Sequence, residues 1–117
     1  DISWIGYSHG TAGIITALVA ANQYINNPNI LELADKVLSY ENSFYDSNHK
    51  NWKLPSKDNH AVAWCHGAPG ILLSRLMLKE SNYENSILDQ NIYAALDTTI
   101  DKSFGHNRSL CHGDFGN

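Results

Sequence analysis

Three segments of the chain contain a His-Gly pair followed, three residues later, by a second glycine. They are SHGTAGI at Ser8–Ile14, WCHGAPGI at Trp64–Ile71 and LCHGDFGN at Leu110–Asn117. Both cysteines of the chain, Cys65 and Cys111, fall inside these segments, as do three of its six histidines. Thiolate and imidazole groups are the ligands that zinc prefers in proteins. Their concentration at repeated turns predicts a zinc site.

Cys111 and His112 are adjacent in the sequence, which restricts the backbone conformations in which both can bind one ion. Neighbouring residues on a helix point about 100° apart, so both side chains can bind one ion only from an irregular segment. Gly113 supplies that freedom, and Cys65 in the equivalent turn is the natural third ligand. A Cys₂His set with an open fourth position is typical of catalytic zinc, whereas His66 as a fourth ligand would make the zinc structural. The residue types leave these two alternatives open.

The ligand set also indicates a kind of chemistry. A substrate thiol in the open position would be deprotonated by the metal. Two protein thiolates already offset the charge of zinc, so a third, incoming thiolate stays nucleophilic. Helix N-termini after each turn would further favour thiolates over thiols. The predicted site therefore suits addition or alkylation of a thiol better than hydrolysis.

His9 stands where the other two segments have a Cys-His pair, but Ser8 takes the place of the cysteine. If the three turns converge, His9 lies near the metal and is a candidate acid or base. The alternative is a helix-capping or core histidine. The remaining histidines, His49, His60 and His106, lie in polar stretches and are weak ligand candidates. Arg75 and Asp114, near the motifs, are expected either to contact substrate or to pair with each other. Trp64 is expected to pack beside the site.

Apolar periodicity predicts an all-helical chain built from helical hairpins. Helices are expected at about Ile14–Ile25 and Ile30–Phe44, with Pro28 among the residues that end the first. A third follows WCHG with Pro69 in its first turn, and a fourth follows Ser81-Asn82 and ends near Gly105. The polar segment 46–59 is expected to be a loop, and no strand is predicted. The expected inward residues of the last two helices are Leu72, Leu73, Leu76 and Met77, then Leu88, Ile92, Leu96, Ile100 and Phe104.

Composition narrows the class of protein. The 117 residues are 43% hydrophobic and 17% charged, which predicts one modest globular domain and disfavours disorder. A net charge of −4 does not indicate binding to nucleic acid, which requires a basic surface. No apolar run is long enough for a membrane span. Cysteines beside histidines favour a reduced, metal-binding context, so a bacterial cytoplasmic location is expected.

At these residues the chain resembles the lanthionine synthetase C-like family, zinc-dependent cyclases that form thioether bridges in peptides. It is most similar to the cyclase half of the bifunctional class II (M-type) lanthipeptide synthetases. The matching segments are GYSHGTAGI at Gly6–Ile14, YENSFYDSNHKNW at Tyr40–Trp52, AWCHGAPGI at Ala63–Ile71 and SLCHGDFGN at Ser109–Asn117.

The resemblance implies a site and a fold. It implies Cys65, Cys111 and His112 as zinc ligands, His9 as the catalytic acid/base, and His66 outside the metal's ligand shell. The implied fold is an α/α toroid of helical hairpins, of which residues 1–117 would be a partial cyclase domain within a longer chain. An incomplete ring would leave apolar helix faces uncovered, so self-association is possible.

The implied reaction is Michael-type addition of a peptide cysteine thiolate to dehydroalanine or dehydrobutyrine, as in lantibiotic biosynthesis. The partner would be a precursor peptide that carries cysteine and dehydrated serine or threonine. Two alternatives remain: a homologue that adds glutathione to dehydrated residues, and a non-catalytic helical-repeat binding module with structural zinc.

Overall fold

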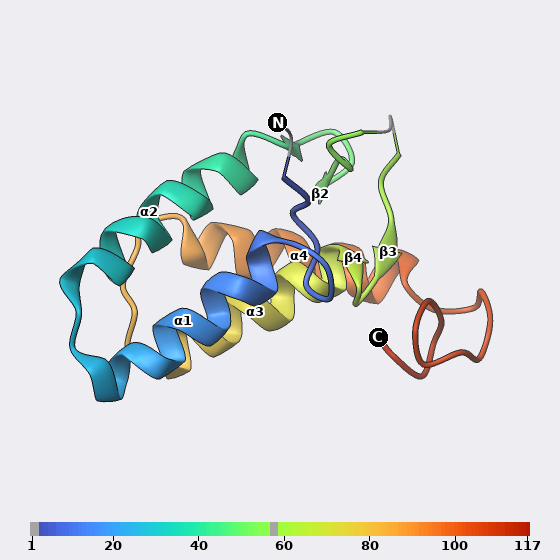
Figure 1. The fold of residues 1–117 in the computed structure, drawn as a ribbon. Coiled ribbons are helices and arrows are strands. Elements are labelled where there is room, and N and C mark those ends of the chain that lie inside the picture. The colour runs from blue at the N-terminus through green and yellow to red at the C-terminus, as the bar shows by residue number, and fades with distance from the viewer. Residues whose placement is uncertain (1–2, 57–58) are drawn as a thin grey trace.

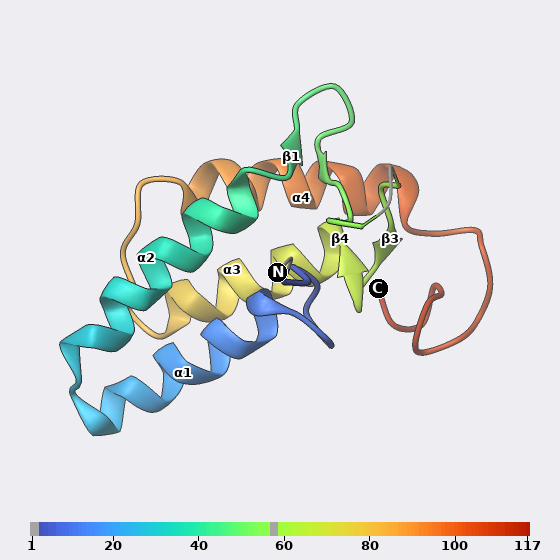
Figure 2. The ribbon, with the colours of Figure 1, turned by 45° about the horizontal axis from the view of Figure 1, so that its top comes forward.

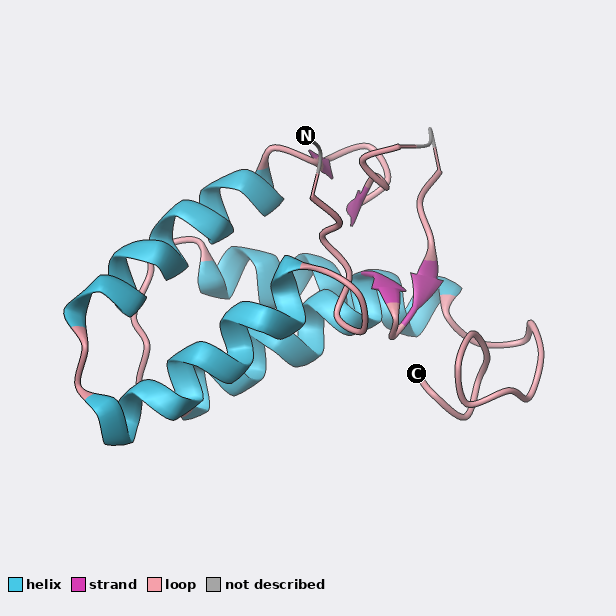
Figure 3. Cartoon of the chain, viewed as in Figure 1, coloured by secondary structure: helices cyan, strands magenta, loops and turns pink. Residues whose placement is uncertain are grey.

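The chain forms four helices and two very short strand pairs in residues 3–56 and 59–117, which the computed structural model describes. The helices are α1 (Thr11–Ile25), α2 (Pro28–Asn42), α3 (Ala68–Glu80) and α4 (Leu88–Lys102). Helices α1 and α3 lie side by side, while α2 packs on α1 and α4 packs on α3 (Figure 1, Figure 3). The prediction of an all-α fold of helical hairpins is confirmed. Among the described residues, none of the helices combines the length and hydropathy needed to cross a membrane.

The connection between α1 and α2 consists of two residues, Asn26 and Asn27. Asn26 ends α1 with a left-handed backbone, φ 55°, a conformation that asparagine tolerates well. The Asn27 side chain then accepts a hydrogen bond of 3.0 Å from the backbone N–H of Asn29 and so caps α2. Pro28, expected to end the first helix, is in fact the first residue of the second. Proline fits there because the first N–H of a helix has no partner within it.

The segment expected to be a loop contains a small hairpin. β1 (Tyr45–Asp46) pairs antiparallel with β2 (Asn51–Trp52), and further on β3 (Val62–Ala63) pairs with β4 (His66–Gly67). The Trp52 side chain is completely buried and lies 4.9 Å from the Tyr45 ring, centroid to centroid. The expectation of no strands is therefore wrong at these points. Two-residue strands carry too little alternation to be seen in a sequence.

Two groups of buried apolar side chains form the core. One lies beneath the strand pairs and includes Ile5, Ala12, Trp52, Ala68, Ile71 and Ala95. The other lies toward the opposite end of the helices and includes Ile15, Val19, Ala34, Leu38, Leu78, Tyr83 and Leu88.

The buried faces of α3 and α4 differ from the predicted ones. Several leucines and other large apolar side chains expected inside are exposed, namely Leu73, Leu76, Leu96, Ile100 and Phe104. The α4 face toward the core instead carries small and polar residues, namely Asn91, Ala95, Thr98 and Thr99. Small side chains let α3 and α4 approach closely, and the buried polar atoms find hydrogen-bond partners there.

A buried ion pair occupies the centre of the helix bundle. Arg75 of α3 donates to a Glu41 carboxylate oxygen of α2 at 2.7 Å, and both side chains are fully buried. Thr11 at the start of α1 donates to the other Glu41 oxygen at 2.5 Å, and Arg75 Nε donates to Asn91 of α4 at 3.2 Å. This network joins all four helices. The expectation that Arg75 contacts substrate or pairs with Asp114 is wrong, because its buried guanidinium forms an ion pair with Glu41.

Candidate metal centre

The three His-Gly turns gather at one end of the molecule. Helices α1 and α3 both begin at this end, and the segment after α4 returns to it (Figure 2). The Trp64 indole N–H donates to the Leu110 carbonyl at 2.6 Å, and the Trp64 backbone N–H donates to the Asn117 side chain at 2.8 Å. The Ser8 N–H donates to the Cys65 carbonyl at 3.4 Å. Trp64 thus packs beside the site, as predicted, and also ties the last turn to the middle one.

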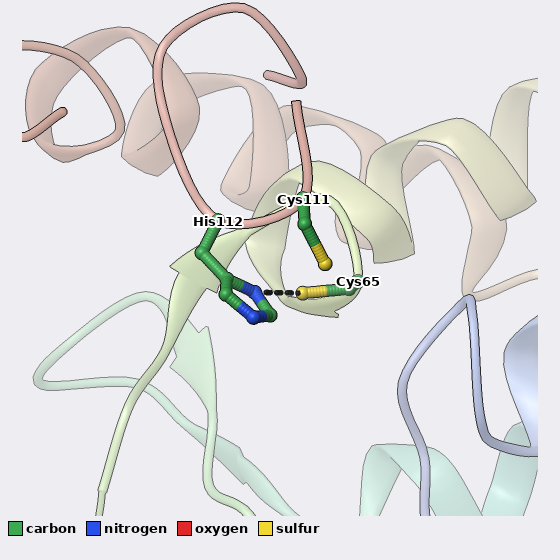
Figure 4. Close-up of side chains that lie close together, drawn as sticks. All are labelled: Cys65, Cys111 and His112. Carbon is green, nitrogen blue, oxygen red and sulfur yellow. Dashed lines mark hydrogen bonds between the residues drawn. The ribbon is translucent and has the colours of Figure 1, made fainter. Parts of the chain in front are cut away.

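Cys65, Cys111 and His112 come together between two of these turns. Cys65 follows β3 and is buried, whereas Cys111 and His112 lie on the exposed segment after α4. One ligand atom from each residue lies within 4.8 Å of those of the other two. Cys65 Sγ is 3.0 Å from His112 Nδ1, and the Cys111 sulfur points toward the same place (Figure 4). The Ser109 hydroxyl accepts the His112 backbone N–H at 3.1 Å and helps to set this turn.

The donor set of this group suits zinc. Two ligands of a tetrahedral zinc are about 3.5–3.8 Å apart when Zn–S is about 2.3 Å and Zn–N about 2.0 Å. Cys65 Sγ and His112 Nδ1 are 3.0 Å apart and all three ligand atoms lie within 4.8 Å of one another, so shifts of the exposed Cys111 and His112 would bring them to this spacing. His66 does not belong to the group, so among the described residues the set offers three protein ligands.

The electrostatics around Cys65 reflect its burial. Burial raises the pKa of the Cys65 thiol, and the nearby Cys111 thiol raises it further. A bound cation opposes both effects, because a coordinating thiol loses its proton to the metal. Metal binding and deprotonation of Cys65 are therefore coupled.

His9 and His66 form a second part of the same region. Their ring centroids are 5.8 Å apart, and the Trp4 ring is 5.6 Å from His66. Burial lowers the pKa of His66, and the nearby His9 and His112 lower it further. Gly6 is needed here, because a side chain at this position would collide with the His66 ring and the Cys65 carbonyl. His66 is therefore close both to the exposed His9 and to His112 of the metal-capable group.

A surface hollow lies next to His9. Its lining includes Tyr7, Gly13, Ile14 and Trp64, and the Tyr7 and Trp64 rings meet edge to face with centroids 6.1 Å apart. The role of Trp4 beside His66 was missed by the sequence analysis, since a lone tryptophan near the chain start carries no spacing signal. Gly6 was not singled out either, although it is the first residue of the GYSHG segment that contains His9.

The other sequence candidates lie elsewhere. The Asp114 carboxylate accepts the backbone N–H groups of Gly105 and His106 at 3.1 and 3.2 Å, so it shapes the loop after α4. His106 contacts the Lys102 carbonyl at 2.6 Å. His49 and His60 lie together, away from the three turns, against Asp46.

Comparisons with known proteins agree with this geometry. The model of the lanthionine synthetase C-like protein family matches residues 3–117, nearly the whole chain. The chain is also 28% identical over 122 residues to the lacticin 481/lactococcin biosynthesis protein of Lactococcus lactis subsp. lactis. That alignment covers 95% of this chain and 13% of the relative, so the chain spans about an eighth of the relative's length. With three His-Gly turns at one end of paired helices and a match over nearly its full length, this chain belongs to the lanthionine synthetase C-like protein family.

Proposed function

We propose that this chain is part of a zinc-dependent lanthipeptide cyclase, which forms thioether bridges in a dehydrated precursor peptide. The observation that carries the proposal is the convergence of Cys65, Cys111 and His112 from segments far apart in the chain. The name of the Lactococcus relative supports a role in lantibiotic biosynthesis, and hence a peptide as the substrate.

We propose further that residues 1–117 belong to a larger cyclase domain. Large apolar side chains remain exposed on all four helices, including Ile14 on α1, Leu33 on α2, Leu76 on α3 and Ile100 on α4. Further helical hairpins of an α/α toroid would cover such faces, and until covered they also favour self-association. Both cysteines are free, which suits a reducing compartment such as the bacterial cytoplasm.

Cys65, Cys111 and His112 would hold the zinc. When bound, the ion would lower the pKa of a substrate cysteine thiol so that it reacts as the thiolate. The thiolate sulfur forms a bond to the β-carbon of a dehydroalanine or dehydrobutyrine, and the π electrons move toward the α-carbon and its carbonyl. A proton must then reach the α-carbon to complete the thioether product.

We assign this proton donation to His9. Its side chain is exposed beside a hollow that a peptide could enter, and it belongs to the turn that lacks a cysteine. It also lies outside the metal-capable group, so it is free to exchange protons with solvent. The proton given to the product balances the one that the substrate thiol releases.

The test uses the full-length protein that contains this chain, with a dehydrated precursor peptide as substrate. His9→Asn is expected to keep zinc near the wild-type level and to slow thioether formation about 10²–10⁴-fold, as for a lost general acid/base. Cys65→Ala is expected to lose zinc and activity together. Ring formation is followed by thiol alkylation and mass spectrometry, and zinc by metal analysis.

His106→Asn is the matched control. This exposed histidine lies outside the metal-capable group, so its substitution should leave the rate and the zinc content unchanged. A normal rate in the His9 variant would make His9 a packing or capping residue. Addition of glutathione in preference to the peptide's own cysteines would favour the glutathione-adding alternative. Full zinc with no thioether formed by the wild type would favour a binding module.

A further inference from the structure

A second cluster of metal-capable side chains is formed by Asp46 and His49 of the β1–β2 hairpin and by His60, which precedes β3. Asp46 Oδ2 is 2.9 Å from His49 Nδ1 and 3.2 Å from His60 Nε2, and the three ligand atoms lie within 4.8 Å of one another. The two imidazole rings stack with centroids 4.1 Å apart and planes 16° apart. None of these residues belongs to the Cys65 group.

The distances from Asp46 to each histidine are close to those between ligands of one ion, and one of the stacked rings would turn so that both nitrogens face it. Two nitrogen or oxygen ligands, each about 2.1 Å from a metal, are about 3.0 Å apart at a right angle and about 3.4 Å apart at the tetrahedral angle. The two distances from Asp46 to the histidines fall at or near this range. His60 Nε2 is buried and makes no hydrogen bond of acceptable geometry, even though the Asp46 oxygen is close. Such an atom is expected to have a partner, and a cation between these groups would provide one.

The fold holds the cluster in place from both sides. The Asp46 carboxylate accepts the Asn48 backbone N–H at 2.9 Å, which orients it within the hairpin. The Asn51 side chain donates to the Ala61 carbonyl at 3.0 Å and fastens the hairpin to the segment that carries His60. The completely buried Trp52 anchors β2 in the core. The ligands therefore come from a supported hairpin and not from a free loop.

The nearby charges are compatible with a bound cation. Lys53 Nζ lies 4.0 Å from the Asp46 oxygen and is the cation that an ion would have to displace. Lys50 is directed away, because it pairs with Asp97 of α4 at 2.5 Å.

We propose that Asp46, His49 and His60 form a second metal site, which binds a divalent transition ion of the zinc class. Two imidazoles and one carboxylate suit such an ion better than calcium or magnesium, which prefer oxygen ligands. His60 precedes β3, and β3 leads directly to Cys65. A metal here clamps the hairpin to the strand that positions Cys65. The site does not depend on the proposed cyclase activity.

The test separates this site from the thiolate group. In a Cys65→Ser/Cys111→Ser variant of the chain, zinc titration by calorimetry is expected to show one remaining equivalent. Adding Asp46→Asn or His49→Ala should weaken this binding by more than about 100-fold, since changes outside the ligand shell alone cost about 10–100-fold. Adding His106→Ala instead should leave it unchanged. Circular dichroism checks that each variant keeps its helices.

A Co²⁺ titration provides a second readout. In the same double-serine variant, bound Co²⁺ should give weak ligand-field bands without the intense thiolate-to-cobalt charge transfer that the wild-type chain also shows. Failure of the helical double-serine variant to bind zinc would overturn the second site. Equal zinc binding after Asp46→Asn would overturn the assigned ligands.

Discussion

Two separate groups of metal-capable side chains are assembled in different ways. Cys65 and His112 are 47 positions apart and meet only because α3 and α4 carry the chain out and back. Asp46 and His49 are three positions apart on one hairpin. The first group has two soft thiolates, whereas the second has two imidazoles and a carboxylate. Thus the first group depends on the helical framework, and the second depends mainly on a local turn.

The largest expected difference between the two groups is in the metal that the protein retains when one ligand of either group is replaced. Cys111→Ala should remove most of the zinc held by the first group, because water does not replace a thiolate at similar affinity. Asp46→Asn should leave that zinc in place. Thiolate-bound metal is measured by the charge-transfer band of the Co²⁺-loaded protein. An undiminished band in the Cys111 variant would contradict the assignment of this cysteine as a ligand.

The framework that brings the first group together is expected to respond strongly to loss of its buried ion pair. Arg75→Met leaves the Glu41 carboxylate without its cation and should lower the free energy of unfolding by about 3–5 kcal/mol. Lys36→Met, in an exposed pair with Glu32, should change it far less, because solvent screens an exposed ion pair. Denaturant unfolding of the metal-free protein checks both. Similar small effects would mean that the buried pair does not hold the helices together.

The pH dependence of zinc binding should also distinguish the groups. The Cys65 thiol has a raised pKa, so it is protonated at neutral pH without metal and must release its proton on binding. The zinc affinity of the first group should therefore rise by at least about tenfold per pH unit near neutrality. The second group contains no thiol and releases no thiol proton, so its affinity should depend less steeply on pH. Calorimetry at several pH values, with one group disabled at a time, measures the two slopes.

The smallest expected effect concerns His66. Its pKa is lowered, so as the pH falls below about 6.5 the unfolded chain takes up this proton before the folded one. The stabilising contribution is thus present above that pH and is lost on acidification toward the folded-state pKa. Histidine NMR of the metal-free protein should show His66 titrating below the usual value. Titration at or above that value would mean that the ring is more open to solvent than its contacts with Trp4 and His9 imply.

Several features followed from the sequence alone. The repeated His-Gly turns identified the three side chains that the fold brings together, because ligand types and glycine spacing are written directly in the residues. The helices also followed from apolar periodicity. The ends of α1 and α2 lie close to those expected, whereas α4 begins at Leu88, later than the expected start after Asn82. The first turn of α1, before Ile14, and the start of α2 at Pro28 depend on backbone conformation, which apolar periodicity does not report.

Only the tertiary structure decided which helix faces are inside. Leu76 and Ile100 match an apolar stripe, yet both are exposed, while Arg75 is fully buried. Burial depends on which neighbour each face meets, and Arg75 is inside because Glu41 arrives from another helix to neutralise it. The same holds for His60, a weak candidate by sequence, which gains a place beside Asp46 when the hairpin folds against β3. Residue types specify what a side chain can do, but proximity between distant segments exists only after the chain has packed.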